Sequence, residues 1–258
     1  MEEIIVQTKP FKLSQRILSA FASPTKLMEN IKECPVLMPP ILFFLVVGLV
    51  LAICLSGSTE VLTQAQSEAR ISRYGTDIMA IPNADTPEAQ QQANIVKYST
   101  MGGMVFGSVT NPYVNGFFMA LVLLLVTKVI MKGNATLQQN FSMCVHIFIV
   151  TSTLGIITYA YMDIMKVPID TLSLAATDPT VPLFSTRYAL LSSVSLAGIW
   201  QALLIFIGVR VLNDNFSNVK AGIAAGVIFL GNMLIAVVAS YGVTMFYDFL
   251  YATKQMSN

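Results

Sequence analysis

Charged side chains are scarce in this sequence: Asp, Glu, Lys and Arg make up 11% of the 258 residues, and hydrophobic residues make up 55%. An ordinary soluble domain carries roughly 25% charged residues. A chain with so little charge cannot cover a globule that faces water. Its apolar residues also gather in runs of about 20, the length that crosses a hydrocarbon core of roughly 30 Å. Lipid is therefore the expected solvent for most of the fold.

Histidine and cysteine are also rare, with one His and three Cys in the whole chain. Three cysteines do not build a disulfide framework, and a lone histidine without a buried carboxylate gives no metal site. The apolar runs contain no serine elbow and no Asp pair. A formal net charge of +1 gives no reason to expect nucleic acid. We therefore predict no enzyme, no catalytic residue, no metal, no cofactor and no nucleic-acid partner.

The apolar runs predict an all-α fold, a polytopic membrane helix bundle whose transmembrane domain covers residues 36–247. About five transmembrane helices are expected, at residues 36–55, 112–131, 141–161, 188–211 and 221–247. The polar stretch before the first run is too long for the start of a signal peptide, so we expect that run to remain in the mature protein.

The first 35 residues are expected to form a cytoplasmic segment with an interfacial helix. Residues 11–33 interleave apolar and basic side chains, which predicts an amphipathic element lying on the membrane. Ser23-Pro24 should divide it, because Ser favours the N-cap and Pro the first helical position. The alternative is a partly ordered tail.

A long outer loop, residues 56–111, is expected to contain local helices. One should run from Thr59 to Tyr74 and stop at Gly75, and another should open at Thr86-Pro87. The glycine-rich stretch Gly102–Gly107 either lies in the interface or dips into the membrane and returns. The second span is placed from Pro112, because Asn-Pro is a cap and first-turn pair.

Basic residues lie unevenly beside the predicted spans, and this sets the expected orientation. With the N-terminus inside, the much longer outer segments hold six Lys and Arg, while the inner segments hold nine: Lys9, Lys12, Arg16, Lys26, Lys32, Lys128, Lys132, Arg210 and Lys220. Basic residues resist translocation, so we predict a cytoplasmic N-terminus and a C-terminal tail, residues 248–258, outside.

Three polar side chains fall at membrane depth and are the candidate site residues: His146, Gln201 and Asn232. A titratable or amide side chain is costly there unless it faces protein or water. Two interpretations stay open. These residues line an intramembrane polar site, or they form hydrogen bonds that hold helices together.

Small residues in the fifth run predict close helix packing. Gly222 and Gly226 are spaced as small-xxx-small, and Gly231 follows. The partner helix belongs either to the same chain, which we favour, or to a second copy in a homo-oligomer.

The organisation resembles the Yip (Ypt-interacting protein) domain family, in particular its short bacterial members. The resemblance rests on four stretches: Phe21-Ala22-Ser23-Pro24 with Lys26, Ile31-Lys32 and Cys34-Pro35; Lys132-Gly133-Asn134-Ala135-Thr136; Gly198-Ile199-Trp200-Gln201; and Asn218-Val219-Lys220-Ala221. Eukaryotic members add a longer cytosolic region with an acidic-aromatic Gly-Pro motif and bind Rab-type GTPases. This chain has no counterpart to that motif.

The resemblance implies a non-enzymatic membrane adaptor or accessory subunit that assists transport or trafficking. Its expected partners are the lipid bilayer and other membrane proteins, including subunits of an ABC-type exporter as in some bacterial members, and its expected location is the bacterial cytoplasmic membrane. The alternative function is a small permease or channel, with a polar site between helices formed by His146, Gln201 and Asn232.

Overall fold

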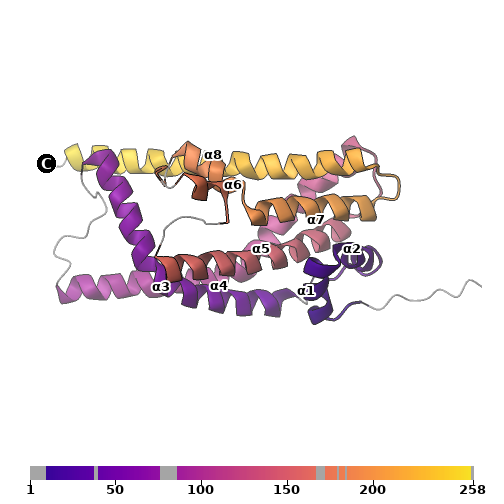
Figure 1. Cartoon of the computed structure of the whole chain (residues 1–258), viewed down its shortest axis with the longest axis horizontal. Helices are drawn as coiled ribbons and strands as arrows, with labels where there is room; N and C mark the ends of the chain where they lie inside the picture. Colours follow the sequence, from indigo (N-terminus) through magenta and orange to yellow (C-terminus); the bar gives the residue numbers. More distant parts are fainter. Residues whose placement is uncertain are drawn as a thin grey trace, which may run out of the picture. The chain divides into compact units, whose positions relative to one another are not determined.

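The computed structural model describes residues 10–37, 40–75, 86–166, 172–178, 180–183 and 185–256. Every named element in these ranges is a helix, so the all-α prediction is confirmed; Ser173 and Ser195 form an isolated β-bridge. The elements, labelled in part in Figure 1, are α1 Leu13–Ala22, α2 Pro24–Glu33, α3 Pro40–Tyr74, α4 Pro87–Leu124, η1 Leu125–Ile130, α5 Leu137–Met165, η2 Leu174–Thr177, α6 Thr186–Ser193, α7 Leu196–Leu212 and α8 Asn218–Met256.

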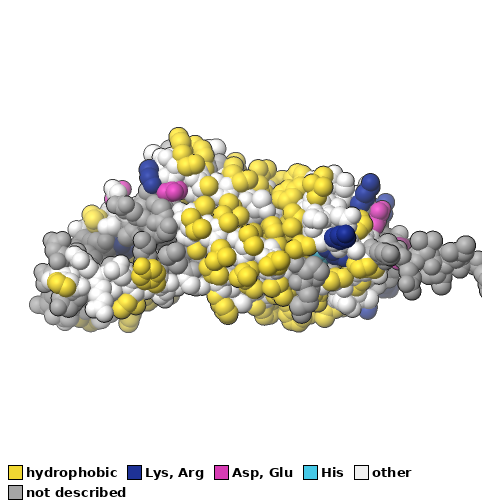
Figure 2. Space-filling model, turned by 90° about the horizontal axis from the view of Figure 1, so that it is seen from below, with side chains coloured by type: hydrophobic (Ala, Val, Ile, Leu, Met, Phe, Trp, Pro, Cys, Tyr) yellow, Lys and Arg dark blue, Asp and Glu magenta, His cyan; other side chains and the backbone are white. Residues whose placement is uncertain are grey.

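Three helical stretches among the described residues are long and apolar enough to cross a membrane: Val105–Ile130, Leu137–Met165 and Asn218–Met256. Each exceeds the roughly 20 residues that a crossing needs. Pro40–Cys54 and Leu196–Leu212 are shorter apolar helices. Figure 2 shows many hydrophobic side chains on the face that it presents, with few charged ones between them. A membrane protein follows from these helices and from the family reported below.

The chain divides into two compact units. The first, unit 1, consists of residues 1–47, 107–153 and 199–229. Its core is centred on the buried side chains of Phe44, Val145 and Ile149. The short linker between α2 and α3 is fastened to this core, because its backbone carbonyls accept hydrogen bonds from the side chains of α4 and α5: Gln138 to Pro35, Ser142 to Val36 and Tyr113 to Leu37.

The second unit, unit 2, consists of residues 48–106, 154–198 and 230–258. The end of α3 contacts α8 in this unit. The hydroxyl of Tyr74 donates to Asp248 over 2.7 Å, Arg73 forms a salt bridge with the same carboxylate, and the rings of Tyr74 and Tyr251 stack.

Several helix boundaries agree with the local signals of the sequence. A new helix, α2, begins at Pro24, although the side chain of Ser23 makes no capping hydrogen bond. The helix α3 ends before Gly75, whose φ of 74° is the left-handed conformation typical of a residue after a helix. The helix α4 begins at Pro87, as predicted.

Two predicted helix starts are wrong. We expected separate elements at residues 36–55 and 59–74, but α3 is one continuous helix from Pro40 to Tyr74. Pro112 does not open a helix; it lies inside α4, and Gly102–Gly107 is helical as well. A proline inside an apolar helix is tolerated where neighbouring groups satisfy the backbone carbonyl that it leaves free.

The predicted run 188–211 is two helices, α6 and α7, rather than one. The break lies at Val194-Ser195, where the backbone pairs with a distant loop: Leu174 N donates to Val194 O over 3.0 Å, and Leu196 N donates to Leu172 O over 2.8 Å. The hydroxyl of Ser195 then accepts from Gly198 N and caps the new helix.

Candidate functional site

Arg16, on α1, is buried with 0% of its surface exposed. Its guanidinium donates to neutral acceptors from three parts of unit 1. Nε donates to Phe11 O over 3.0 Å, and Nη2 donates to Asn30 Oδ1 over 3.0 Å and to Cys34 O over 3.4 Å. Nη1 donates to His146 Nε2 over 3.1 Å. The fork of donors on one arginine therefore ties α1 to α2 and to α5.

The hydrogen bonds of His146 determine which ring nitrogen carries its proton. An arginine can only donate, so Nε2 of His146 must be the acceptor. Nδ1 then carries the proton and donates to Ser142 O over 2.7 Å. Both ring nitrogens are thus engaged, one with the backbone of α5 and the other with α1.

The positive charge of Arg16 is solvated by neutral hydrogen-bond acceptors and is not paired with a carboxylate. None of the salt bridges among the described residues involves Arg16. Burial lowers the pKa of Arg16 from its ordinary value, and the neighbouring Cys34 thiol opposes that shift. The guanidinium nevertheless stays protonated, because an arginine side chain does not lose its proton in a protein. Loss of any acceptor would leave a buried charge less well solvated.

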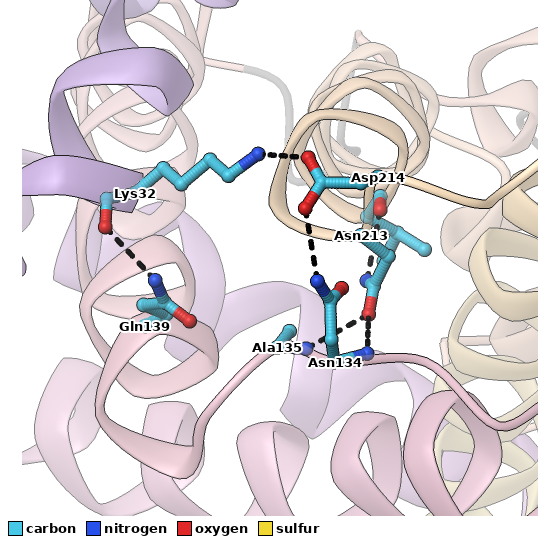
Figure 3. Close-up of polar contacts among 7 residues, drawn as sticks. Lys32, Asn134, Ala135, Gln139, Asn213 and Asp214 are labelled. Atoms are coloured by element: carbon cyan, nitrogen blue, oxygen red, sulfur yellow. Dashed lines mark hydrogen bonds and ion pairs between the residues drawn. The ribbon is translucent and has the colours of Figure 1, made fainter.

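A second polar cluster joins α2 to the loops at the same unit's helix ends, and we call it the loop clasp: Lys32, Asn134, Ala135, Asn213 and Asp214 (Figure 3). Asn213 is buried, and its Oδ1 accepts from Asn134 N over 2.9 Å and from Ala135 N over 3.0 Å. Its Nδ2 donates to Val209 O over 2.9 Å. One amide side chain thereby fixes the backbone of the loop that leads into α5.

Asp214 completes the clasp at its exposed edge. The carboxylate forms a salt bridge with Lys32 and accepts a hydrogen bond from Asn134 Nδ2 over 2.9 Å (Figure 3). The hydrogen bond from Lys32, and to a smaller extent the one from Asn134, lowers the pKa of Asp214 from its ordinary value. Gln139 Nε2 donates to Lys32 O over 2.8 Å, so α2 is also held at its backbone.

Gly133 allows the loop to approach Asn213 closely. A Cβ at this position would collide with Asn213 Oδ1 and would lie 2.9 Å from ring carbons of Phe216. The backbone N–H of Gly133 donates to Thr127 O over 2.7 Å, which joins the loop to the π-helix η1. A glycine is therefore required here for space.

The three candidate polar residues have different surroundings. His146 is buried against Arg16, whereas Gln201 Nε2 donates to the sulfur of Met119 over 3.4 Å. Asn232 is exposed on α8. No hydrogen bond among the described residues joins these three side chains to one another, and a shared polar site remains a prediction.

The glycines Gly222, Gly226 and Gly231 lie in open space. A Cβ built at any of them meets no atom within 4 Å. The buried positions of α8 are instead Ala221, Ala224, Ala225 and Ile228. Helix packing through these glycines remains a prediction, and the contact would have to come from outside the described residues.

Asn213 and Arg16 are the residues that sequence reasoning missed. Arg16 was counted only as a basic residue of an amphipathic element, and its burial has no local signal. Asn213 contacts backbone groups 78 and 79 residues earlier in the chain. No group of His, Cys, Asp and Glu in the part of the chain that the structure describes could hold a metal ion.

Apolar helices of this length, with polar clusters that fasten helices together, are those of an integral membrane protein. The Yip1 domain matches residues 18–240, and the chain belongs to this family. No curated protein and no solved structure matches the chain.

Proposed function

We propose that this chain is a non-enzymatic integral membrane adaptor or accessory subunit that assists membrane transport or trafficking. The observation that carries this proposal is the engagement of Arg16 and His146 in structural hydrogen bonds, in a chain of the Yip1 domain family. The polar groups of the Arg16 cluster and of the loop clasp fasten α1 and α2 to the helix ends. They build a fixed surface for a partner rather than a reaction centre.

We further propose five crossings of the bacterial cytoplasmic membrane. The three long apolar helices supply three, and the shorter apolar helices Pro40–Cys54 and Leu196–Leu212 supply the other two. The excess of Lys and Arg beside the predicted inner ends supports a cytoplasmic N-terminus and an outer C-terminus. The helices α1 and α2 then lie at the inner interface.

The surface to which a partner would bind is the exposed side of α2. Thr25, Lys26 and Glu29 are exposed there, while Leu27, Met28 and Ile31 are buried against unit 1. We propose that membrane proteins bind this side, with a subunit of an ABC-type exporter as the leading candidate partner and a homo-oligomer as the other.

Cross-linked purification in mild detergent tests the adaptor role. We expect an integral membrane partner to be recovered with the native chain and lost with the double variant Lys26→Ala/Glu29→Ala. Lys166 is an exposed lysine of unit 2, so the variant Lys166→Ala should recover the same partner as the native chain. Recovery of this chain alone, or of the same proteins with both variants, would contradict the proposal.

The alternative function is a small permease or channel. His146 is the titratable residue of its candidate polar site, but both ring nitrogens already have partners. Purified protein in liposomes should therefore show no flux of protons, small ions or polar solutes. Flux that disappears in His146→Gln would support the permease instead.

A further inference from the structure

Four basic side chains lie at or beside the ends of three helices in unit 1. Lys128 lies in η1 and Lys132 follows it, Arg210 lies in the last turn of α7, and Lys220 lies in the first turn of α8. We call this set the basic cluster. We propose that the basic cluster binds the phosphate headgroup of an anionic phospholipid.

Specific contacts join the helix ends that carry Lys132, Arg210 and Lys220. Lys220 Nζ donates to Met131 O over 3.3 Å, which places α8 beside the end of η1 and next to Lys132. The ammonium of Lys220 also lies 5.2 Å from the centre of the Phe216 ring. Arg210 Nε donates to Asn218 Oδ1 over 3.0 Å, two residues before Lys220. Backbone and amide contacts thus join the end of η1 and the end of α7 to the start of α8, and none of these contacts uses a carboxylate.

The positive charge of the basic cluster is not balanced by acidic side chains of the described residues, which favours the binding of an anion. Lys128 and Lys132 are exposed, and no salt bridge among the described residues involves any of the four basic side chains. Asp214, the acidic residue of the adjacent loop, is engaged by Lys32 and Asn134. The first turn of α8 has no acidic residue, so the positive end of its dipole adds to the same field.

The side chains beside the lysines favour a lipid over a free phosphate ion. Val129 is 69% exposed, Ile130 is 66% exposed and Val219 is 70% exposed, and each is next to or near a basic residue in sequence. In a membrane these side chains contact acyl chains, while lysines at helix ends extend to the headgroups. An anionic phospholipid matches both halves of this surface, because its phosphate reaches the cations and its chains cover the apolar side chains.

The test uses the full chain in a neutral detergent, with phosphatidylglycerol and phosphatidylcholine as probes and bound lipid counted by native mass spectrometry. The native chain should prefer phosphatidylglycerol. Because each lysine near an anionic headgroup contributes about 1 kcal/mol, Lys128→Gln/Lys132→Gln should bind phosphatidylglycerol roughly thirtyfold more weakly and phosphatidylcholine unchanged. Both lysines are exposed, so this double variant should fold normally.

The matched control removes two basic charges elsewhere. Lys166→Gln/Arg187→Gln breaks two ion pairs at exposed basic side chains of unit 2 and should keep native lipid binding. Equal binding of the two lipids by the native chain, native phosphatidylglycerol binding by Lys128→Gln/Lys132→Gln, or an equal loss in the control would overturn the proposal. So would inorganic phosphate that competes at the same concentration as the lipid, since the acyl chains would then be dispensable.

The proposal rests on the membrane embedding stated above but not on the adaptor role. Lipid binding needs no protein partner. The adaptor test instead measures the recovery of a partner protein that binds the exposed side of α2. A chain that binds phosphatidylglycerol selectively and recovers no partner therefore contradicts the adaptor alone.

Discussion

At the scale of single residues, the fold depends on a buried positive charge that is solvated by neutral acceptors. Arg16 makes use of three nitrogens at once, and a lysine has neither the planar fork nor the reach to replace it. We expect Arg16→Lys to lower the free energy of unfolding by about 2–3 kcal/mol, because Asn30 Oδ1 and His146 Nε2 would lose donors in a buried setting.

Thermal unfolding in detergent measures this effect. The exposed neighbour Lys12 provides the comparison, since Lys12→Gln should change the free energy of unfolding by no more than about 0.5 kcal/mol. Equal melting temperatures for Arg16→Lys and Lys12→Gln would mean that the Arg16 cluster does not stabilise the fold.

Asp214 gives the loop clasp a predictable pH dependence. Its pKa is lower in the folded chain than in the unfolded chain, so its stabilising contribution is present above the unfolded value of about 3.9. The contribution is lost as the pH falls through the lower, folded value. The protection factors of the Asn134 and Ala135 amides, which compare their hydrogen exchange with that of an unfolded chain at the same pH, should therefore fall in acid below about pH 4.

Asp214→Asn is the matched variant for this pH prediction. It removes the charge that Lys32 pairs with but keeps a side chain of the same size, so the protection factors of the same amides should be lower at pH 7 and should change less in acid. If these amides kept the same protection in the native protein and in Asp214→Asn at every pH, Asp214 would not stabilise the loop clasp.

At the scale of helices, two helical glycines differ in the space around them. A Cβ at Gly208 on α7 would collide with the sulfur of Met143 and lie 3.2 Å from the sulfur of Met28. We expect Gly208→Ala to destabilise the fold by about 1–3 kcal/mol, as overpacking of a filled core does. Because Met28 lies on α2 and Met143 on α5, the variant should also loosen α2.

Gly222→Ala on α8 is the natural control, because nothing lies within 4 Å of a Cβ there. Alanine is favoured over glycine in a helix by up to about 1 kcal/mol, so this variant should be neutral or slightly more stable. Thermal unfolding of Gly208→Ala and Gly222→Ala measures the two changes in stability. A destabilised Gly222→Ala would instead support the prediction that this face packs against another helix.

Local sequence signals predicted some helix ends and missed others for an identifiable reason. Pro24, Gly75 and Pro87 act through their own backbone, so the boundaries beside them could be predicted. The break at Val194-Ser195 is made by pairing with Leu172 and Leu174, which no local pattern reveals. The candidate site shows the same limit, because Arg16 and His146 meet across 130 positions of sequence.

At the scale of the whole molecule, composition was sufficient to identify a helical membrane protein but not to count its crossings. Three described helices meet the length that a span requires, and two apolar helices are shorter. The proposal of five crossings therefore depends on Pro40–Cys54 and Leu196–Leu212 each traversing the bilayer. An odd number of crossings places the two ends of the chain on opposite sides.

The sidedness of those ends is the most direct test of the account. Single cysteines are placed at Lys26 and Lys254 in a chain whose native Cys34, Cys54 and Cys144 are replaced by alanine, and intact cells are treated with a thiol reagent that cannot cross membranes. We expect Lys254→Cys to react in intact cells and Lys26→Cys to react only after the membrane is opened. Reaction of both cysteines from the same side would contradict the five-crossing arrangement and the faces assigned to every loop.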